Sequence, residues 1–135
     1  MERATCVLDA SALLAYLNDE TGAQLVEDAL IRGAAISAVN MAEVLSKLAE
    51  TGREPDEVNN ELQRRGFLGV TLAVLPMTAE DAVVIANLHT KTKAHGLSLG
   101  DRACLALALG LRVRALTTDR AWSRLKTAVK VELIR

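Results

Sequence analysis

The sequence has few aromatic residues and almost no net charge. Phe, Tyr and Trp occur once each, whereas Ala and Leu occur 22 times each, so we expect an aliphatic, helix-rich core. The formal net charge is −1, from 16 basic and 17 acidic residues. This balance excludes a polybasic nucleic-acid tail and an acidic disordered chain.

Cysteines and long apolar runs are also scarce. Cys6 and Cys104 lie in separate apolar stretches, which argues against a disulfide framework or a close zinc pair and indicates buried thiols in a reducing compartment. No stretch approaches the ~18 uninterrupted apolar residues of a membrane span. Asp9 interrupts the first apolar run before a signal sequence could form. We therefore expect a cytoplasmic protein with no membrane partner.

Short apolar runs alternate with segments of helical period. Strands are predicted over residues 4–8, 34–37, 70–75, 113–116 and 129–134, and helices over 11–17, 23–31, 38–50, 55–65, 78–94, 103–111 and 120–126. Residues 78–81 and 98–101 have the pattern of capping boxes. The alternation predicts an α/β fold in which a mainly parallel sheet of about four to five strands lies between two helical layers. A chain of 135 residues fits one domain spanning residues 1–135.

This pattern places four acidic residues near one end of the sheet. Asp9 directly follows the first strand, and Asp119 follows the strand that ends near residue 117. Asp101 lies in the first turn of an apolar helix, and Glu43 lies in the early turns of the helix after the second strand. Ligands of open α/β sheets bind beyond the carboxyl ends of the strands. The four carboxylates are therefore positioned to converge there.

Each acid alone has a simpler explanation, as a helix cap or an exposed helix residue. Together, however, clustered carboxylates repel one another, and both burial and like charge raise their pKa values. A divalent cation removes this conflict, and oxygen ligands suit Mg²⁺ or Mn²⁺. Such a metal activates water and stabilises charge on a phosphate. The pattern therefore favours phosphodiester chemistry.

Four segments carry these acids: VLDASALLA at 7–15, NMAEV at 40–44, LSLGDRACLALA at 97–108 and LTTDRAW at 116–122. In order and spacing they resemble the PIN-domain nucleases and, within that family, the VapC toxins of prokaryotic toxin–antitoxin pairs. The resemblance spans the whole chain. It implies a three-layer α/β/α PIN-like domain that acts as a metal-dependent endoribonuclease with Mg²⁺ or Mn²⁺ as cofactor.

The resemblance also assigns roles to individual residues. The family's acidic site is carried over onto Asp9, Glu43, Asp101 and Asp119, with Asp9 and Asp101 as the principal metal ligands. The small hydroxyl positions of the motifs fall on three residues that would orient carboxylates or water around the metal. Local capping is the alternative for all three, which are Ser11, Ser98 and Thr117.

Partners follow from the resemblance and from the charge distribution. The resemblance implies an RNA substrate, a homodimer, and a VapB-like antitoxin that inhibits the toxin by covering the acidic site. Residues 89–135 carry 10 basic and 3 acidic residues, so we expect RNA contacts from Arg102, Arg120 and Arg124 near the mouth of the site. Solvated helix faces explain these arginines equally well. Trp122 either stacks on a base or packs in the core.

Other phosphate-handling classes fit poorly. A receiver domain needs an Asp where Pro76 stands, and a dehalogenase-type phosphatase needs an Asp in place of Ser11. The eight glycines form no Gly-rich phosphate loop, and no histidine lies near Ser11 to make it a nucleophile. The remaining alternative is a PIN-fold module that binds RNA or an antitoxin and cleaves little or nothing.

Overall fold

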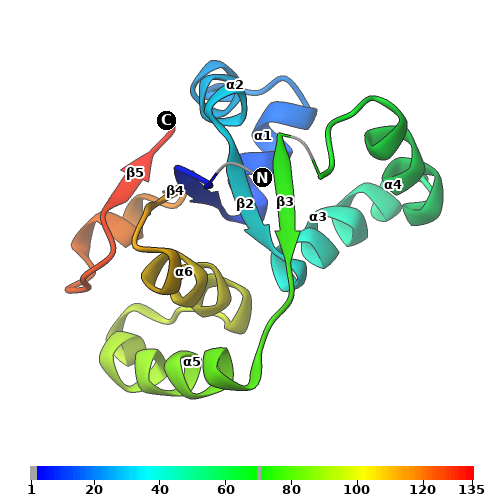
Figure 1. Cartoon of the computed structure of the whole chain (residues 1–135). Helices are drawn as coiled ribbons and strands as arrows, with labels where there is room; N and C mark the ends of the chain where they lie inside the picture. Colours follow the sequence, from blue (N-terminus) through cyan, green and yellow to red (C-terminus); the bar gives the residue numbers. More distant parts are fainter. Residues whose placement is uncertain (1–2, 70) are drawn as a thin grey trace.

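The computed structural model describes residues 3–69 and 71–135. Its centre is a five-stranded sheet in the order β3-β2-β1-β4-β5, in which all neighbouring strands are parallel (Figure 1). The strands are β1 (Cys6–Leu8), β2 (Ala34–Ser37), β3 (Leu72–Leu75), β4 (Arg114–Thr117) and β5 (Val131–Leu133). The predicted α/β fold with a parallel sheet is thereby confirmed.

In the described part of the chain, six α-helices and two short 3-10 helices connect the strands. They are α1 (Ala10–Leu17), α2 (Ala23–Arg32), α3 (Ala38–Glu50), α4 (Pro55–Arg64), α5 (Ala79–Thr92), η1 (Lys93–His95), α6 (Leu99–Leu111) and η2 (Arg120–Arg124). Both predicted capping boxes form, at the starts of α5 and α6. None of the helices among the described residues is long and apolar enough to cross a membrane.

Most differences from the predicted elements lie at their ends. The first strand starts at Cys6 instead of residue 4, and the last strand is reduced to three residues. The α6 helix starts at Leu99, as the predicted capping box at residues 98–101 indicated, and the predicted apolar segment 103–111 forms its later part. The predicted strand over 70–75 begins at residue 70, which lies outside the described residues.

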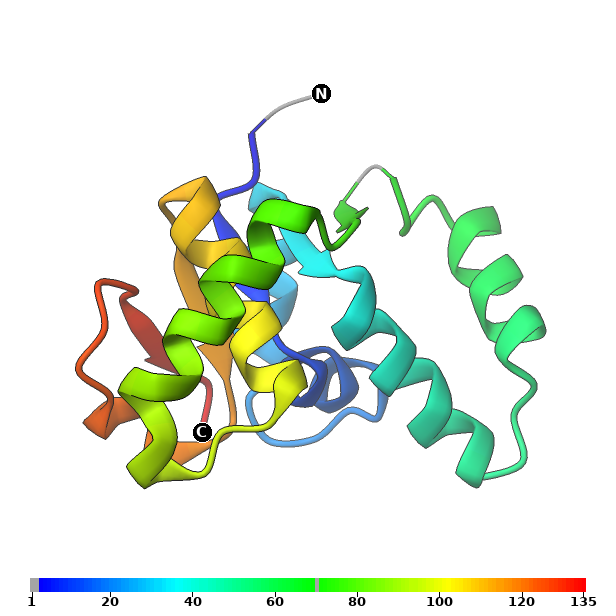
Figure 2. The same ribbon diagram turned by 90° about the horizontal axis from the view of Figure 1, so that it is seen from below.

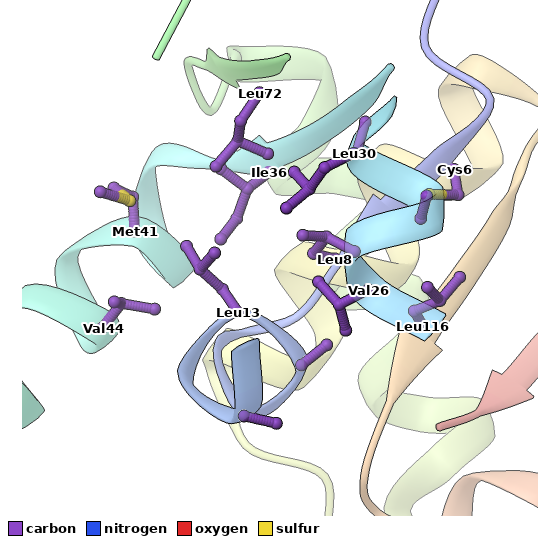
Figure 3. Packing of buried hydrophobic residues seen from close by; sticks show 14 of the residues in the cluster. Cys6, Leu8, Leu13, Val26, Leu30, Ile36, Met41, Val44, Leu72 and Leu116 are labelled. Atoms are coloured by element: carbon purple, nitrogen blue, oxygen red, sulfur yellow. The ribbon is translucent and has the colours of Figure 1, made fainter. Parts of the chain in front are cut away.

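The sheet separates two hydrophobic clusters. On one face, Leu8 and Ile36 pack with residues of α1, α2 and α3, and Figure 3 shows several of these side chains converging. On the other face, Val7 and Ala35 pack with residues of α5 and α6. This alternation along β1 and β2 follows from the period of two in a strand. Figures 1 and 2 show α5 and α6 together on their side of the sheet.

The buried positions agree with the aliphatic core expected from composition. Most of α6 from Ala103 to Ala108 is buried, as its apolar pattern predicted. Cys6 and Cys104 are both free and buried, in agreement with the prediction. Trp122 on η2 is only 1% exposed, so it packs in the core and does not present its ring to a base.

Candidate active site

The carboxyl ends of β1 and β4, together with the early turns of α3 and α6, surround an open pocket of about 450 Å³. Leu8 pairs with Leu116 in the parallel register, so the next residues of both strands emerge side by side. All four predicted acids line this pocket, which we call the acidic pocket. Its lining residues are Asp9, Ala10, Ser11, Leu14, Asn40, Glu43, Lys47, Asp101, Thr118 and Asp119.

Asp9 is the most buried of the four acids, with 5% of its surface exposed. It caps α1, and its Oδ1 accepts hydrogen bonds from Ser11 Oγ at 2.7 Å and from Ala12 N at 2.8 Å. Its Oδ2 accepts a hydrogen bond from Thr117 Oγ1. Burial raises the pKa of the Asp9 carboxyl, against the opposing effect of these hydrogen bonds, and the charge of Asp101 adds to the rise. A cation placed beside Asp9 would favour its charged form.

The hydroxyls of Ser11 and Thr117 join the ends of β1 and β4. Besides contacting Asp9, Ser11 Oγ accepts a hydrogen bond from Thr118 N at 3.0 Å, and Thr117 Oγ1 accepts one from Asp119 N at 3.0 Å. Asp119 itself is exposed, and its Oδ1 accepts a hydrogen bond from the backbone at the start of η2. Capping and carboxylate orientation therefore occur together at these residues.

Glu43 is held against α6 by a buried amide. Asn40 Nδ2 donates to Glu43 Oε1 at 2.8 Å and to the carbonyl of Gly100 at 2.9 Å. A Cβ atom on Gly100 would lie 2.5 Å from Glu43 Oε1, so the glycine leaves the space that this carboxylate occupies. Asn40 belongs to one of the four sequence segments but has no predicted role there, because its contact with α6 depends on how the two helices pack.

Asp101 reaches the acidic pocket from the first turn of α6. Its Oδ2 accepts a hydrogen bond from Ser98 N at 3.0 Å, and its own N–H donates to Ser98 Oγ at 3.1 Å. The Ser98 hydroxyl is therefore used by the helix cap, and Ser98 orients the Asp101 carboxylate through its backbone N–H. Asp101 can therefore form the capping box with Ser98 and line the acidic pocket at the same time.

The three arginines predicted to contact RNA lie in different surroundings. Arg102 is half-buried and donates to the carbonyl of Ile85 on α5 at 3.1 Å, and it is not among the residues that line the acidic pocket. Arg120 and Arg124 are exposed on η2, directly after Asp119 in the chain. Contact of Arg102 with RNA stays a prediction, and in this structure the α5 backbone binds its guanidinium.

Lys47 lines the acidic pocket but was not predicted from the sequence. It lies one helical turn after Glu43 on α3, and residues four apart on a helix share a face. That spacing is the signal that could have identified it. Among the described residues that line the pocket, Lys47 is the only basic one.

The acidic side chains of the pocket offer a metal ion carboxylate oxygens as ligands. Burial raises the pKa of the Cys104 thiol well above its usual value, and the charges of Asp9 and Asp101 add to this rise, so the thiol stays protonated. Within the described residues, no three acidic, His or Cys side chains lie in positions that could jointly hold a metal ion. Asn40 Oδ1 is buried and lacks a hydrogen-bond partner in that part of the chain. The carboxylate oxygens that line the pocket are nevertheless the kind of ligand that Mg²⁺ prefers, and Mg²⁺ commonly binds through only one or two carboxylates and water.

The protein is thus a small α/β domain with an acidic pocket at the carboxyl ends of its parallel strands. Residues 6–128 match the model of the PIN domain, and the chain belongs to this family. The resemblance seen in the four sequence segments is thereby confirmed at the level of the family. A comparison with curated proteins gave no match.

Solved structures similar to this chain include components of toxin–antitoxin systems. A toxin–antitoxin complex from Klebsiella pneumoniae has 18% identity and a TM-score of 0.73, over 96% of this chain and 98% of that chain. VapC20 of Mycobacterium tuberculosis, named as a sarcin–ricin loop cleaving toxin, has 14% identity and a TM-score of 0.72, over 93% and 98%. DNA-bound VapBC from Salmonella typhimurium has 18% identity and a TM-score of 0.68, over 100% of both chains. At these identities the likeness shows a shared fold.

Proposed function

We propose that this protein is a metal-dependent endoribonuclease of the VapC toxin type that hydrolyses RNA phosphodiester bonds in the acidic pocket. The observation that carries the proposal is that acids from four separate segments of a PIN domain, Asp9, Glu43, Asp101 and Asp119, line one pocket. PIN domains generally use divalent metal ions, and the oxygen donors here suit Mg²⁺ or Mn²⁺. When bound, such a cation lowers the pKa of an attacking water and offsets charge on the phosphate.

In this proposal Asp9 and Asp101 are the principal metal ligands, and Glu43 and Asp119 complete the charged surroundings. The neighbouring polar groups act by holding these carboxylates in place. Ser11 and Thr117 donate to Asp9, the Ser98 backbone donates to Asp101, and Asn40 donates to Glu43.

We also propose a VapB-like antitoxin that covers the acidic pocket with a basic side chain, and a homodimeric toxin. Support for the antitoxin comes from similar structures that are themselves toxin–antitoxin complexes. The excess of carboxylates in the pocket suits a basic side chain.

We also propose that the protein acts in the cytoplasm. Its two buried free thiols indicate a reducing compartment, and the cytoplasm is such a compartment.

Cleavage of cellular RNA by the purified, antitoxin-free protein tests the proposed function. We expect cleavage in Mg²⁺ or Mn²⁺ and none in EDTA, measured by gel electrophoresis and mapping of the new RNA ends. If wild-type protein binds RNA but leaves total RNA containing ribosomal, transfer and messenger RNA intact with both metals, the non-catalytic binding module becomes the better explanation.

Metal binding should raise the thermal stability of the protein. A ligand that binds only the folded state adds about 2.7 kcal/mol at roughly 100 times its Kd, which corresponds to a Tm increase of roughly 10 °C for a domain of this size. Glu43→Gln retains the acceptor for Asn40 but removes a charge from the pocket, so its Mn²⁺-induced Tm increase should be smaller. Differential scanning fluorimetry over a Mn²⁺ titration measures both.

The matched control for this titration is Glu27→Gln, the same chemical change on the exposed part of α2. It should keep the full Mn²⁺ response. A wild-type Tm that stays constant up to millimolar Mg²⁺ and Mn²⁺ would contradict a metal site in the acidic pocket.

The exposed arginines of η2 should contribute to RNA affinity. Arg120 follows Asp119 directly and Arg124 ends the same short helix η2, so we expect a phosphate backbone that enters the acidic pocket to pass close to them. Replacing both with Ala should weaken RNA binding and flatten the dependence of log K on log salt by about 0.7 for each phosphate that is no longer neutralised. Fluorescence anisotropy in EDTA measures this without cleavage. Arg32→Ala, on the exposed end of α2, is the control, and a slope unchanged in the double variant would remove η2 from the interface.

A further inference from the structure

The acidic pocket continues into a second hollow of about 330 Å³. Ser11, Leu14 and Lys47 line both hollows, so the two form one continuous depression between α1 and α3. The second part, which we call the flanking groove, is bounded further on by Asn18 at the end of α1 and Thr51 at the end of α3. A substrate held in the acidic pocket therefore has room to extend along this groove.

Lys47 stands where the two hollows meet, and its charge is largely free. Its Nζ lies 3.6 Å from Glu50 Oε2, and the two side chains are 66% and 69% exposed. Exposed ion pairs of this kind are weak and screened by salt, so a phosphate can compete with Glu50 for the ammonium group. By contrast, the cation at the far side of the groove, Arg135, is bound to both Glu20 Oε1 and the Thr21 carbonyl.

The negative charge of the acidic pocket repels RNA phosphates, so a positive side chain at its edge would help RNA to bind. A phosphodiester that enters the pocket approaches four carboxylates, and Lys47 is the only basic residue in the lining within the described part of the chain. An ammonium group at the junction with the flanking groove would attract the phosphate next to the one being cleaved. The groove volume lies at the lower end of the range of about 300–1,000 Å³ for small-ligand sites, which suits a single nucleotide.

We propose that Lys47 and the flanking groove form a subsite for the nucleotide adjacent to the scissile phosphate, with Lys47 pairing to that nucleotide's phosphate. The inference rests on the proposed RNA cleavage and adds a direction to it. RNA then crosses the strand ends between η2 on one side and α3 on the other. Of these two elements, α3 packs against α6, whose start is yellow in Figure 2, and η2 begins directly after Asp119 of the acidic pocket.

Lys47→Ala tests the subsite through RNA affinity in the full-length protein. The side chain is exposed on a helix, and Ala is a good helix former, so the fold is retained. With a fluorescein-labelled, short single-stranded RNA of random sequence in EDTA, we expect weaker binding and a salt slope reduced by about 0.7 to 1. Lys47→Arg should keep the slope. The control is Lys130→Ala, an exposed lysine at the amino ends of the strands, and it should also keep the slope.

Cleavage of cellular RNA in Mn²⁺ separates this inference from the proposed function. Loss of the positive charge should raise KM more than it lowers kcat, and Lys47→Arg should restore KM. If wild-type protein cleaves RNA and Lys47→Ala keeps both its salt slope and its KM, the subsite is overturned and the nuclease stands. If Lys47→Ala instead loses affinity only for a copurified antitoxin, Lys47 belongs to a protein interface and the RNA subsite is also overturned. Failure of the wild type to bind RNA would overturn both proposals.

Discussion

Replacing Asp101 with Asn is expected to reduce metal-dependent RNA cleavage at least about 100-fold without unfolding the protein. Loss of a group that only supports a metal ligand already costs about 10- to 100-fold, and Asp101 is proposed to be a ligand itself. The amide oxygen of Asn can still accept the hydrogen bond from Ser98 N that begins α6. The fold should therefore survive while the pocket loses a charge. Initial cleavage rates at saturating Mn²⁺ and circular dichroism spectra measure the two effects.

The chain contains a matched control for this experiment. Asp81 has the same place in the capping box of α5, where its Oδ2 accepts from Thr78 N at 2.9 Å and its N–H donates to Thr78 Oγ1 at 3.1 Å. Asp81→Asn therefore makes the same change to a helix cap away from the acidic pocket, and it should retain wild-type cleavage. Equal activity in Asp101→Asn and wild type, with cleavage still abolished by EDTA, would show that Asp101 is not a ligand.

Trp122→Ala is expected to lower the free energy of unfolding by about 3–5 kcal/mol. Trp122 is the largest of the fully buried side chains among the described residues. It packs in the hydrophobic cluster on the side of the sheet that α5 and α6 cover. Domains of this kind are stable by only about 5–15 kcal/mol, so the variant should be marginally folded. Urea denaturation followed by circular dichroism measures the difference.

Trp122→Phe separates packing from hydrogen bonding at the same position. Among the described residues, Trp122 Nε1 is buried without a hydrogen-bond partner, so replacing the indole removes no bond and keeps most of the apolar packing. We expect Phe to cost clearly less than Ala. If both variants have the same urea midpoint as the wild type, packing of Trp122 does not contribute to the stability of the fold.

Much of the architecture follows from local patterns in the sequence. The strands β1 and β2 were predicted as short apolar runs, and α3 was predicted from apolar residues that repeat about every 3.6 positions along one helix face. Capping boxes located the starts of α5 and α6 because both partners of each bond are three residues apart. Strand ends were predicted less well, since edge pairing decides how far β5 extends.

The convergence of the four acids was predictable for a related reason. Parallel strands end at the same edge of a sheet, so residues directly after β1 and β4 must be neighbours. The helices that carry Glu43 and Asp101 begin near the same edge, so these two acids were expected there as well. The functions assigned to these residues stay predictions until the variants are measured. The bond between Arg102 and α5 could not be predicted, because a position on α6 leaves open which neighbour a long side chain reaches.

By itself, the sequence determined the α/β alternation, the helix caps, the apolar core and the family. These properties depend on neighbours within a few residues along the chain, or on motifs that keep their spacing. Only the tertiary structure decided that Asn40 joins Glu43 to Gly100, that Arg102 is bound by α5, and that Lys47 lies between two hollows. Those contacts link elements far apart in the chain, and they are set by how the helices pack across the sheet.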